Sequence, residues 1–352
     1  MLDYINKFNT VWFAPTYNCN NKCVWCYASS NLLENRCKSI AENNEDKAIE
    51  LLDDLKIKQL LLIGGEPTLY SNLVKLIGKA NHKGIKTGLV TNGRRLKDKN
   101  LVRELKKEGL EYLSVSIEGY DERTHDSITQ SSGSFLESLE GIENSLGENI
   151  RTSTNTTGSS KNINDFEKIV DLLAQYKLKS ITFNICGVCL GSSENNSYTI
   201  SPSHGIKAFE QTYKYFKTKN KNVKLKLISP VPLCNLDYNI LEELKETNSV
   251  KGTCHIFGGR NFVLDYNGDI LPCTHFTGFP MFNVFSEKGI MNVKEFLQEY
   301  NNPENIGNKF RERLKYYPSA KCSKGCEERC TGGCPLFWSK YNPTKEIKGF
   351  SE

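Results

Sequence analysis

Three cysteines near the start of the chain have a spacing that suits metal binding. Cys19, Cys23 and Cys26 fall within one run of eight residues, Cys-Asn-Asn-Lys-Cys-Val-Trp-Cys. A cubane [4Fe–4S] cluster normally takes four thiolates, so a loop that supplies three would leave one iron free for a ligand from outside the chain. The alternatives are three chance cysteines and a zinc site, whose loops usually supply cysteine pairs that combine with distant ligands.

The cysteine content of the whole chain also favours metal ligation. There are 13 cysteines in 352 residues, and four of them, Cys322, Cys326, Cys330 and Cys334, form a second tight group. The start of the chain lacks the apolar segment typical of an export signal, and a chain of this length does not need disulfides for stability. We therefore expect metal-binding thiols rather than disulfides.

The composition is that of an ordinary globular protein. Apolar residues make up 38% of the chain, charged residues 25%, and the formal net charge is +5. So small a charge gives no reason to expect a nucleic-acid partner. No apolar run approaches the roughly 18 residues that suggest a transmembrane helix. The expected location is the cytoplasm, without membrane contact.

Short apolar runs alternate with longer amphipathic stretches from about residue 10 to residue 230. This alternation predicts a parallel sheet with helices outside it, and six such units predict an open, partial (β/α)6 barrel of the α/β class, with functional groups at the carboxyl ends of its strands. The predicted strands are 10–15, 59–63, 86–91, 112–117, 150–155 and 180–185. The predicted helices are 46–55, 69–80, 99–108, 134–146 and 164–176, the last with Asn164 as its N-cap.

The pattern changes after residue 230, where we expect a smaller, cysteine-rich α+β module. Two strands, 261–265 and 269–271, flank the pair Asn267-Gly268, which predicts a β-hairpin. A helix is expected at 293–300, before the cysteine-rich run 322–334. The chain is thus divided into residues 1–230 and residues 231–352.

The first cysteine motif resembles that of the radical S-adenosylmethionine (SAM) superfamily. This family spaces its three cysteines by three and then two residues and places an aromatic residue, here Trp25, before the last. Gly64-Gly65-Glu66-Pro67 resembles the family's GGE motif, and Thr91-Asn92-Gly93 and Ser116-Ile117-Glu118 resemble later segments. The resemblance implies a [4Fe–4S] cluster that binds and cleaves SAM. The SAM contacts that it implies are Trp25, Tyr27, Gly64, Gly65, Glu66, Pro67, Asn92, Ser116, Glu118 and Asn155.

One segment departs from the family pattern. His125-Asp126-Ser127-Ile128 resembles a stretch that many relatives continue with Arg-Gly, whereas Thr129-Gln130 follows here. In the family that arginine contacts the SAM carboxylate, so the contact needs another residue in this chain. Arg123 and Arg151 are the candidates.

The cysteines of the last third resemble the SPASM extension, which binds auxiliary [4Fe–4S] clusters. Gly268 precedes Pro272-Cys273 at the family spacing, as Cys330 precedes Cys334. The three gaps from Cys322 to Cys334 each hold three residues, however, where the family has two, five and three, and zinc knuckles are the alternative. The resemblance implies one or two auxiliary clusters. Cys254, Cys273 and Cys334 would hold the nearer one, with Cys234 as the candidate fourth ligand. Cys322, Cys326 and Cys330 would hold the farther one, whose fourth ligand would be an Asp, a His, water or no protein atom.

Three residues are candidates for catalysis. Cys186 and Cys189 end the sixth predicted strand and should face the barrel mouth, as a hydrogen-atom donor or a further cluster ligand would. Buried cysteine is nevertheless most often a small apolar core residue, and this interpretation also covers Cys37. Sulfatase maturases of the family carry an Asp base directly after the hairpin cysteine; here Thr274 and His275 follow, and His275 could take the role of the base.

The resemblance implies an enzyme that modifies a peptide. The expected reaction is reductive cleavage of SAM to a 5′-deoxyadenosyl radical, which abstracts hydrogen from a ribosomally synthesised peptide and leads to a thioether or carbon cross-link or to an epimer. The alternatives are an anaerobic sulfatase maturase, a small-molecule radical SAM enzyme, and a zinc or iron–sulfur regulatory protein. The expected reductant is flavodoxin- or ferredoxin-like. Because the motif begins at Cys19, a leader peptide is expected to bind either a separate leader-recognition protein or a surface of the barrel itself.

Overall fold

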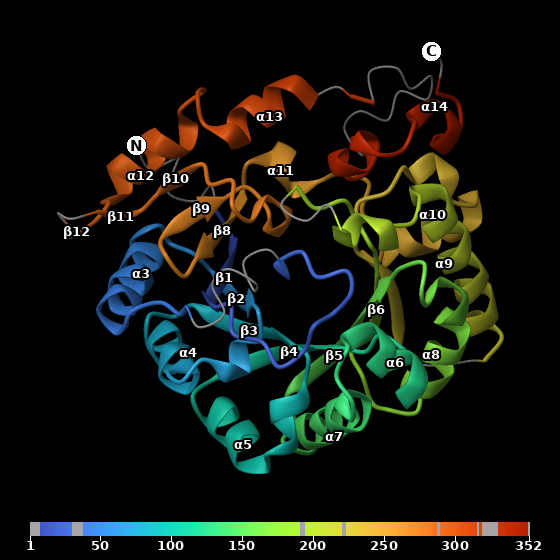
Figure 1. Ribbon diagram of the computed structural model, residues 1–352, viewed down its shortest axis with the longest axis horizontal. Coiled ribbons are helices and arrows are strands. Elements are labelled where there is room, and N and C mark those ends of the chain that lie inside the picture. Colours follow the sequence, from blue (N-terminus) through green and yellow to red (C-terminus); the bar gives the residue numbers. More distant parts are fainter. Residues whose placement is uncertain are drawn as a thin grey trace.

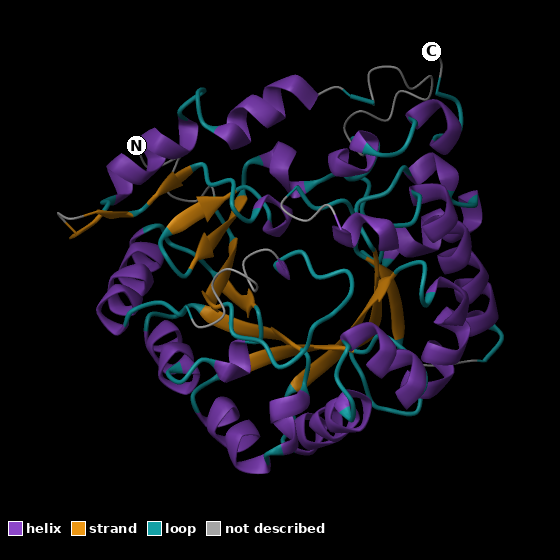
Figure 2. Cartoon of the chain, viewed as in Figure 1, coloured by secondary structure: helices purple, strands orange, loops and turns teal. Residues whose placement is uncertain are grey.

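The computed structural model describes residues 8–29, 38–190, 194–219, 223–286, 289–314, 317–318 and 330–350. Within them, a ten-stranded sheet runs in the order β10-β9-β8-β1-β2-β3-β4-β5-β6-β7. Neighbouring strands from β1 to β7 pair in parallel. Figure 1 shows these strands forming a curved sheet with helices on its outer side, and Figure 2 shows the same two layers by secondary structure. The predicted partial barrel is confirmed.

The barrel alternates strands and helices. Its strands are β1 Thr10–Thr16, β2 Gln59–Gly64, β3 Lys86–Thr91, β4 Leu110–Ser116, β5 Arg151–Gly158, β6 Ser180–Ile185 and β7 Lys224–Leu227. Its helices are α3 Glu42–Asp54, α4 Leu73–His82, α5 Lys99–Lys107, α6 Glu122–Thr129, α7 Ser134–Gly147, α8 Phe166–Leu173 and α9 Pro202–Lys217. Because the strands are parallel, their carboxyl ends meet at one edge of the sheet.

Buried side chains of the strands form the core between sheet and helices. Leu60 and Leu62 of β2 and Leu89 of β3 are fully buried, as expected for parallel strands that are covered by helices. β5 is different, because its buried side chains are mostly hydroxyls. One of them, on Thr156, donates to the carbonyl of Ile117 on the neighbouring segment (2.7 Å).

One helix begins later than the sequence predicts. Pro67–Leu69 forms a 3-10 turn, and the Glu66 carboxylate caps this turn by accepting the Thr68 N–H. The chain then needs a further turn before α4 begins at Leu73 rather than at residue 69. The Glu66 side chain therefore shapes the backbone that follows it.

Other differences concern the second half of the barrel. The segment predicted as 164–176 opens with a 3-10 turn, Ile163–Asp165, and Asp165 precedes α8, so Asn164 is not its cap. The sequence-based prediction also missed α6, α9 and β7. α9 does carry a start signal, because Ser201 caps it and Pro202 occupies its first turn.

The predicted hairpin joins the barrel sheet. β8 (Asn261–Asp265) and β9 (Asp269–Leu271) pair antiparallel, and Gly268 in their turn has φ +89°, a value that favours glycine. β8 also pairs in parallel with β1. The sheet thus continues past residue 230, and the division there stays a prediction. The other C-terminal elements are α10 Tyr238–Glu246, α11 His255–Gly258, β10 Phe282–Asn283, β11 Phe285–Ser286, β12 Gly289–Ile290, α12 Val293–Asn301, α13 Ile306–Leu314 and α14 Pro343–Glu346.

A buried hydrogen bond links the hairpin to the segment after β1. Tyr17 follows β1, and its hydroxyl donates to Asp265 at the end of β8 (3.1 Å). Both side chains are almost fully buried. Burial raises the pKa of Asp265 to about 7, against the lowering effect of hydrogen bonds from Tyr266 and Tyr17. The carboxyl end of β8 is therefore fixed next to the carboxyl end of β1.

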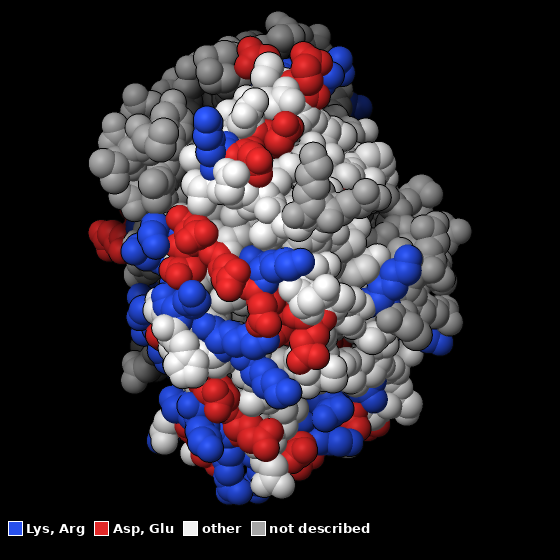
Figure 3. Space-filling model, turned by 90° about the vertical axis from the view of Figure 1, so that its left-hand side faces the viewer, with Lys and Arg blue, Asp and Glu red and all other residues white. Residues whose placement is uncertain are grey.

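The charged surface is mixed in sign. On the side of the molecule that carries α3 and α4, lysines and carboxylates alternate (Figure 3). Lys79 pairs there with Asp46, and Lys83 pairs with Asp53. In the part of the chain that the structure describes, no helix is long and apolar enough to cross a membrane.

The raised pKa of Asp265 predicts how stability depends on pH. A carboxyl whose pKa is higher in the folded chain holds its proton more tightly there, so its contribution to stability is lost as the pH rises from the ordinary pKa of 3.8 to the folded value of about 7. Raising the pH from 5.5 to 8.5 should lower the melting temperature of wild type more than that of Asp265→Asn, a difference of at least about 1 kcal/mol in unfolding free energy, since one pKa unit is about 1.36 kcal/mol. Parallel pH profiles of the two proteins in thermal melts would contradict this.

Candidate functional site

The three cysteines of the first motif lie together in the loop after β1, at the carboxyl edge of the sheet. The side chains of Cys19, Cys23 and Cys26 are half-buried. Burial, reinforced by neighbouring anionic groups, raises the pKa of Cys19 to about 12, and burial raises that of Cys26 to about 11. The pKa of Cys23 is also raised by burial and then by the other two thiols. The loop therefore concentrates three thiols whose negative charge a metal would have to compensate.

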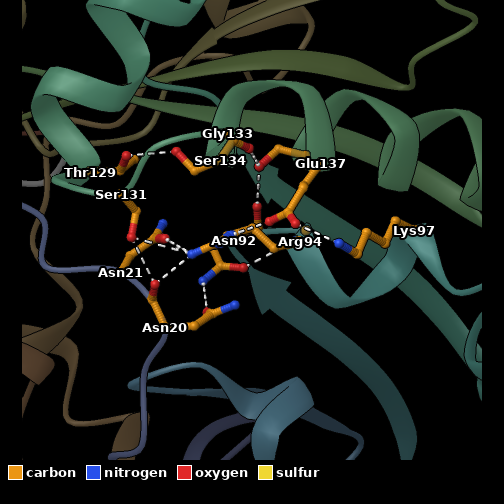
Figure 4. Close-up of polar contacts among 12 residues, drawn as sticks. Asn20, Asn21, Asn92, Arg94, Lys97, Thr129, Ser131, Gly133, Ser134 and Glu137 are labelled. Atoms are coloured by element: carbon orange, nitrogen blue, oxygen red, sulfur yellow. Dashed lines mark hydrogen bonds and ion pairs between the residues drawn. The ribbon is translucent and has the colours of Figure 1, made fainter.

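One side of this loop is held by residues that follow β3. The Asn20 side chain accepts a hydrogen bond from Asn92 (2.7 Å), and the Asn20 carbonyl accepts bonds from Arg94 and from Ser131. Arg94 also donates to the Asn21 side chain (3.0 Å). Figure 4 shows these groups converging between the loop and α7.

The end of α6 forms a second set of contacts with the loop. The N–H of Lys22 donates to the carbonyl of Thr129 (2.8 Å), and the N–H of Val24 donates to that of Ile128 (3.0 Å). This is the stretch in which Thr129-Gln130 replaces the family's Arg-Gly. Its backbone thus anchors the segment between Cys19 and Cys26 in addition to the contacts from Arg94.

Gly64 and Gly65 allow β2 to end directly against this loop. The N–H of Gly65 donates to the Thr16 carbonyl (3.0 Å). A Cβ on Gly64, which has φ +128°, would lie 2.3 Å from that same oxygen, and a Cβ on Gly65 would lie 2.4 Å from the Tyr17 carbonyl and 2.5 Å from that of Asn18. Real Cβ atoms do not approach backbone so closely, so glycine is required at both positions by the loop itself.

The Glu66 carboxylate is buried and fully engaged by the chain. One oxygen accepts bonds from the Thr68 N–H, the Thr68 hydroxyl and the Thr91 hydroxyl, and the other accepts the Asn92 N–H (2.7 Å). Burial raises the pKa of Glu66, while these donors lower it. Glu66 therefore joins the ends of β2 and β3 beneath the cysteine loop, and its predicted SAM contact stays a prediction.

Glu118, by contrast, has a buried oxygen without a partner among the described residues. It is 1% exposed; one oxygen accepts the Thr157 N–H (2.8 Å), and the other has no hydrogen bond. Burial raises the pKa of Glu118 to about 8. The ring Nε2 of His125 and the indole nitrogen of Trp25 are likewise buried without partners in the described structure. Unsatisfied buried polar atoms are costly, so they indicate groups that a ligand completes.

The remaining predicted SAM contacts lie at the same edge. The Tyr27 hydroxyl donates to the Gly64 carbonyl (3.2 Å). Ser116 ends β4 opposite Asn155 of β5, whose side chain accepts a bond from Asn184 (2.7 Å). Pro67 opens the turn that Glu66 caps. Of the two candidate arginines, Arg151 begins β5 at the opposite edge of the sheet and Arg123 is exposed on α6.

These groups fit a [4Fe–4S] cluster with SAM bound to it. Three thiols on one loop are a suitable donor set for three iron atoms. The free acceptor on Glu118 suits a hydroxyl donor such as those of the SAM ribose. Gly64 and Gly65 let the end of β2 approach the loop backbone closely, and Glu66 joins the ends of β2 and β3.

Three cysteines of the C-terminal segment form a second group. Cys254, Cys273 and Cys334 belong to one small apolar cluster, which also contains Val188 and Phe276. Each cysteine directly precedes a short helical turn, and backbone N–H groups from that turn lower the pKa of its thiol. Burial nevertheless raises the pKa of Cys334 to about 11 and that of Cys254 as well. N–H donors around buried sulfurs are what cluster thiolates need.

His275 lies between the two groups of cysteines. Its Nδ1 is 3.5 Å from the Cys273 sulfur, and its ring is 6.2 Å from the ring of Tyr27. Burial lowers the pKa of His275, but hydrogen bonds with the Cys189 and Cys273 thiols outweigh this and raise it. Burial is the main cause of the raised pKa of Cys26, and Cys189 is a smaller cause. The structure thus brings Cys189 and His275 together near the first cysteine loop.

The other predicted cysteines are placed less completely. Cys186 is buried at the end of β6, and Cys189 is among the groups that raise its pKa after burial. The Cys234 sulfur contacts Asn235, and that of Cys330 contacts the Val231 carbonyl. Cys37, Cys322 and Cys326 lie outside the described residues. Within the described ranges, no three Cys, His, Asp or Glu side chains converge closely enough to hold a single metal ion.

The sequence-based analysis missed Arg94 and Asn20, which hold the cysteine loop. Arg94 follows Thr91-Asn92-Gly93 directly, so the motif did mark its neighbourhood. Its partners are more than 70 residues earlier in the chain. Only the folded arrangement of β1 and β3 brings them together.

Gly65→Ala should damage the cysteine loop. The added Cβ would strike two backbone carbonyls at 2.4 and 2.5 Å, and overpacking of this kind costs about 1–3 kcal/mol. We expect a lower melting temperature and less iron bound after anaerobic reconstitution. Gly147→Ala is the matched control, because nothing lies within 4 Å of a Cβ there. Equal melting temperatures and iron contents for the two variants would show that the close approach is unimportant.

Comparison with known proteins agrees with this geometry. Fe-coproporphyrin III synthase of Methanosarcina barkeri is 36% identical over 181 residues, which are 51% of this chain and 44% of that protein. The match therefore spans less than half of the relative's own length. In three dimensions, SuiB of Streptococcus suis, solved with S-adenosylmethionine bound, has a TM-score of 0.71 over 97% of this chain and 76% of that chain, at 18% identity.

A second solved structure has the same fold. It is anSMEcpe with AdoMet and the Cp18Cys peptide, which has a TM-score of 0.67 over 93% of this chain and 89% of that chain, at 18% identity. Residues 13–173 match the model of the Radical SAM superfamily, and this segment contains the three-cysteine loop, Gly64-Gly65-Glu66 and Glu118. Residues 13–173 of this chain are a domain of the radical SAM superfamily of enzymes.

Proposed function

We propose that this chain reductively cleaves SAM to a 5′-deoxyadenosyl radical and abstracts hydrogen from a peptide substrate, maturing a ribosomally synthesised peptide. The observation that carries the radical chemistry is the loop of Cys19, Cys23 and Cys26. It is anchored by Arg94 and by the end of α6 at the carboxyl edge of a radical SAM barrel, beside a Glu118 oxygen that has no partner among the described residues.

The residues of the site have two roles: some hold the cysteine loop in place, and others bind SAM. When bound, the cluster supplies the electron that cleaves SAM. The loop from Cys19 to Cys26 fixes where that electron is delivered, because its backbone is bonded to Thr129 and Ile128. Glu118 would accept a hydrogen bond from a ribose hydroxyl of SAM. Glu66 holds the end of β2 to the end of β3 through its bonds from Thr91 and Asn92.

The C-terminal segment, residues 231–352, is proposed as a SPASM-like module with auxiliary [4Fe–4S] clusters. The gathering of Cys254, Cys273 and Cys334 in one apolar cluster supports the nearer site. Cys234 is a candidate fourth ligand there. The farther cluster would be held by Cys322, Cys326 and Cys330.

Two solved neighbours support a peptide substrate. SuiB has been solved bound to its precursor peptide SuiA, at a TM-score of 0.69, and anSMEcpe with the Cp18Cys peptide. We propose that this chain likewise accepts a peptide, with a separate leader-recognition protein and a flavodoxin- or ferredoxin-like reductant as partners. His275, Cys189 and Cys186 are proposed to face that substrate.

A small-molecule substrate is the second candidate. The relative with 36% identity is named for the synthesis of Fe-coproporphyrin III, and that identity exceeds the 18% shared with SuiB and anSMEcpe. The two candidate substrates are distinguished by which compound is converted to product as SAM is cleaved. Synthetic peptides with the sequences encoded next to the gene, and a tetrapyrrole precursor of Fe-coproporphyrin III, should be compared as substrates by mass spectrometry; stoichiometric conversion of the tetrapyrrole alone would overturn the peptide proposal.

The radical mechanism itself is tested without a substrate. Protein reconstituted without oxygen should bind about four iron atoms per cluster and, with dithionite, convert SAM to 5′-deoxyadenosine. A variant combining Cys19→Ala, Cys23→Ala and Cys26→Ala should lose that activity and one cluster's worth of iron. Chromatography of the nucleoside and iron and zinc analysis provide the readout. Zinc-bound protein that leaves SAM intact would overturn the proposal.

Replacing the two cysteines after β6 tests their predicted role. Cys189→Ala removes a thiol that contacts His275 near the first loop, so we expect product formation to fall at least about tenfold, as for loss of a group that transfers a proton or hydrogen. Iron content and 5′-deoxyadenosine release should persist. Cys186→Ala shows whether the neighbouring thiol shares the role. Wild-type turnover by both variants, with clusters intact, would exclude catalysis by either residue.

A further inference from the structure

Arg94 places a guanidinium directly against the cysteine loop. One terminal nitrogen, Nη1, donates to the Asn20 carbonyl, to the Asn21 side chain (3.0 Å) and to the Ser131 hydroxyl (3.3 Å). Its Nε pairs with Glu137 on α7 (2.5 Å). Figure 4 shows Arg94 between Asn20 and Asn21 on one side and Glu137 on the other. The guanidinium thus bridges the loop to the outer helix.

The environment of Arg94 strengthens these contacts. Its side chain is 16% exposed and that of Glu137 is 25% exposed, so the pair is largely shielded from water. Lys97 pairs with the same carboxylate from a side chain that is 50% exposed. Two cations therefore share Glu137, but Arg94 is the one that also bonds the loop, and hydrogen bonds to charged groups are worth more than neutral ones.

The charge of Arg94 is felt at the cluster position. Cys19, the first ligand of the loop, precedes Asn20 directly, and its sulfur accepts the Asn21 N–H (3.4 Å). Arg94 bonds both Asn20 and Asn21, so its charge is held next to this turn. A nearby cation therefore stabilises negative charge on this sulfur.

We propose that Arg94 is the positioning residue that shapes the Asn20–Asn21 turn and raises the reduction potential of the cluster held by this loop. The inference rests on the proposed function, since it presupposes the cluster. Reduction adds one negative charge to a buried cluster, and cluster potentials depend on net charge and on hydrogen bonds near the sulfurs. A shielded cation beside the loop favours the reduced form, from which SAM is cleaved.

The test measures the potential of reconstituted full-length protein in three variants. Arg94→Gln removes the charge, Arg94→Lys keeps the charge but not the planar fork, and Lys97→Gln removes the neighbouring cation that bonds Glu137. The cluster in question is identified as the one whose electron paramagnetic resonance signal changes when SAM is added. Its midpoint is then titrated without SAM, beside iron and sulfide analysis.

For Arg94→Gln we expect about a tenfold lower ratio of reduced to oxidised cluster at a given solution potential, which is about 59 mV for one electron. Arg94→Lys should shift less, and Lys97→Gln should match wild type. Arg94→Gln could instead lose the iron of this cluster. That result also supports the proposal if Lys97→Gln retains the iron and Arg94→Lys keeps a cluster whose potential lies between those expected for wild type and for Arg94→Gln.

Unchanged iron and potential in Arg94→Gln would overturn the inference while leaving the proposed function intact. An equal shift in Lys97→Gln would also overturn it, because the effect would then be general surface charge. Absence of any SAM-responsive signal in wild type would overturn the proposed function, and this inference with it.

Discussion

β1 is hydrogen-bonded on both sides, in parallel with β2 and with β8. A strand held in this way has little freedom at its carboxyl end, and the chain leaves it directly into the three-cysteine loop. The end of β2 closes against residues 16–18 through two glycines, and the end of β8 reaches the same place through Asp265. The position of the loop therefore depends on strands that lie far apart in the sequence.

Two buried carboxylates at this edge illustrate two uses of the same chemical group. Glu66 accepts four hydrogen bonds from the chain and acts as an internal brace. Glu118 accepts one, and its second oxygen has no bond among the described residues. Burying a carboxylate oxygen without a hydrogen-bond partner costs free energy of folding. The contrast separates a residue whose carboxylate the chain satisfies fully from one whose carboxylate keeps an acceptor open among the described residues.

Much of the fold could be predicted from the sequence because period and spacing are local signals. β3 and β6 begin and end where their apolar runs do. α4 was placed too early, since the turn capped by Glu66 depends on a side-chain bond that periodicity does not reveal. The pairing of β8 with β1 joins residues about 250 positions apart, so no local sequence pattern predicts it.

The candidate site shows the same division. The cysteine spacing and Gly64-Gly65-Glu66 identified the chemistry, but the reason for the glycines is contact with the loop backbone, which only coordinates can show. Arg94 carried no motif of its own. Its function follows from neighbours that the fold supplies, as does the approach of His275 to Cys189.

The carbonyl of Asn20 has a consequence for how the protein matures. It is bonded by Arg94 and by Ser131, 74 and 111 residues further along the chain. The three cysteines are synthesised close together, yet the turn between them is bonded as in the folded structure only once the chain through Ser131 has been made and folded. The shape of this loop is thus coupled to formation of the strands and helices up to Ser131, and a shorter nascent chain cannot present the finished loop.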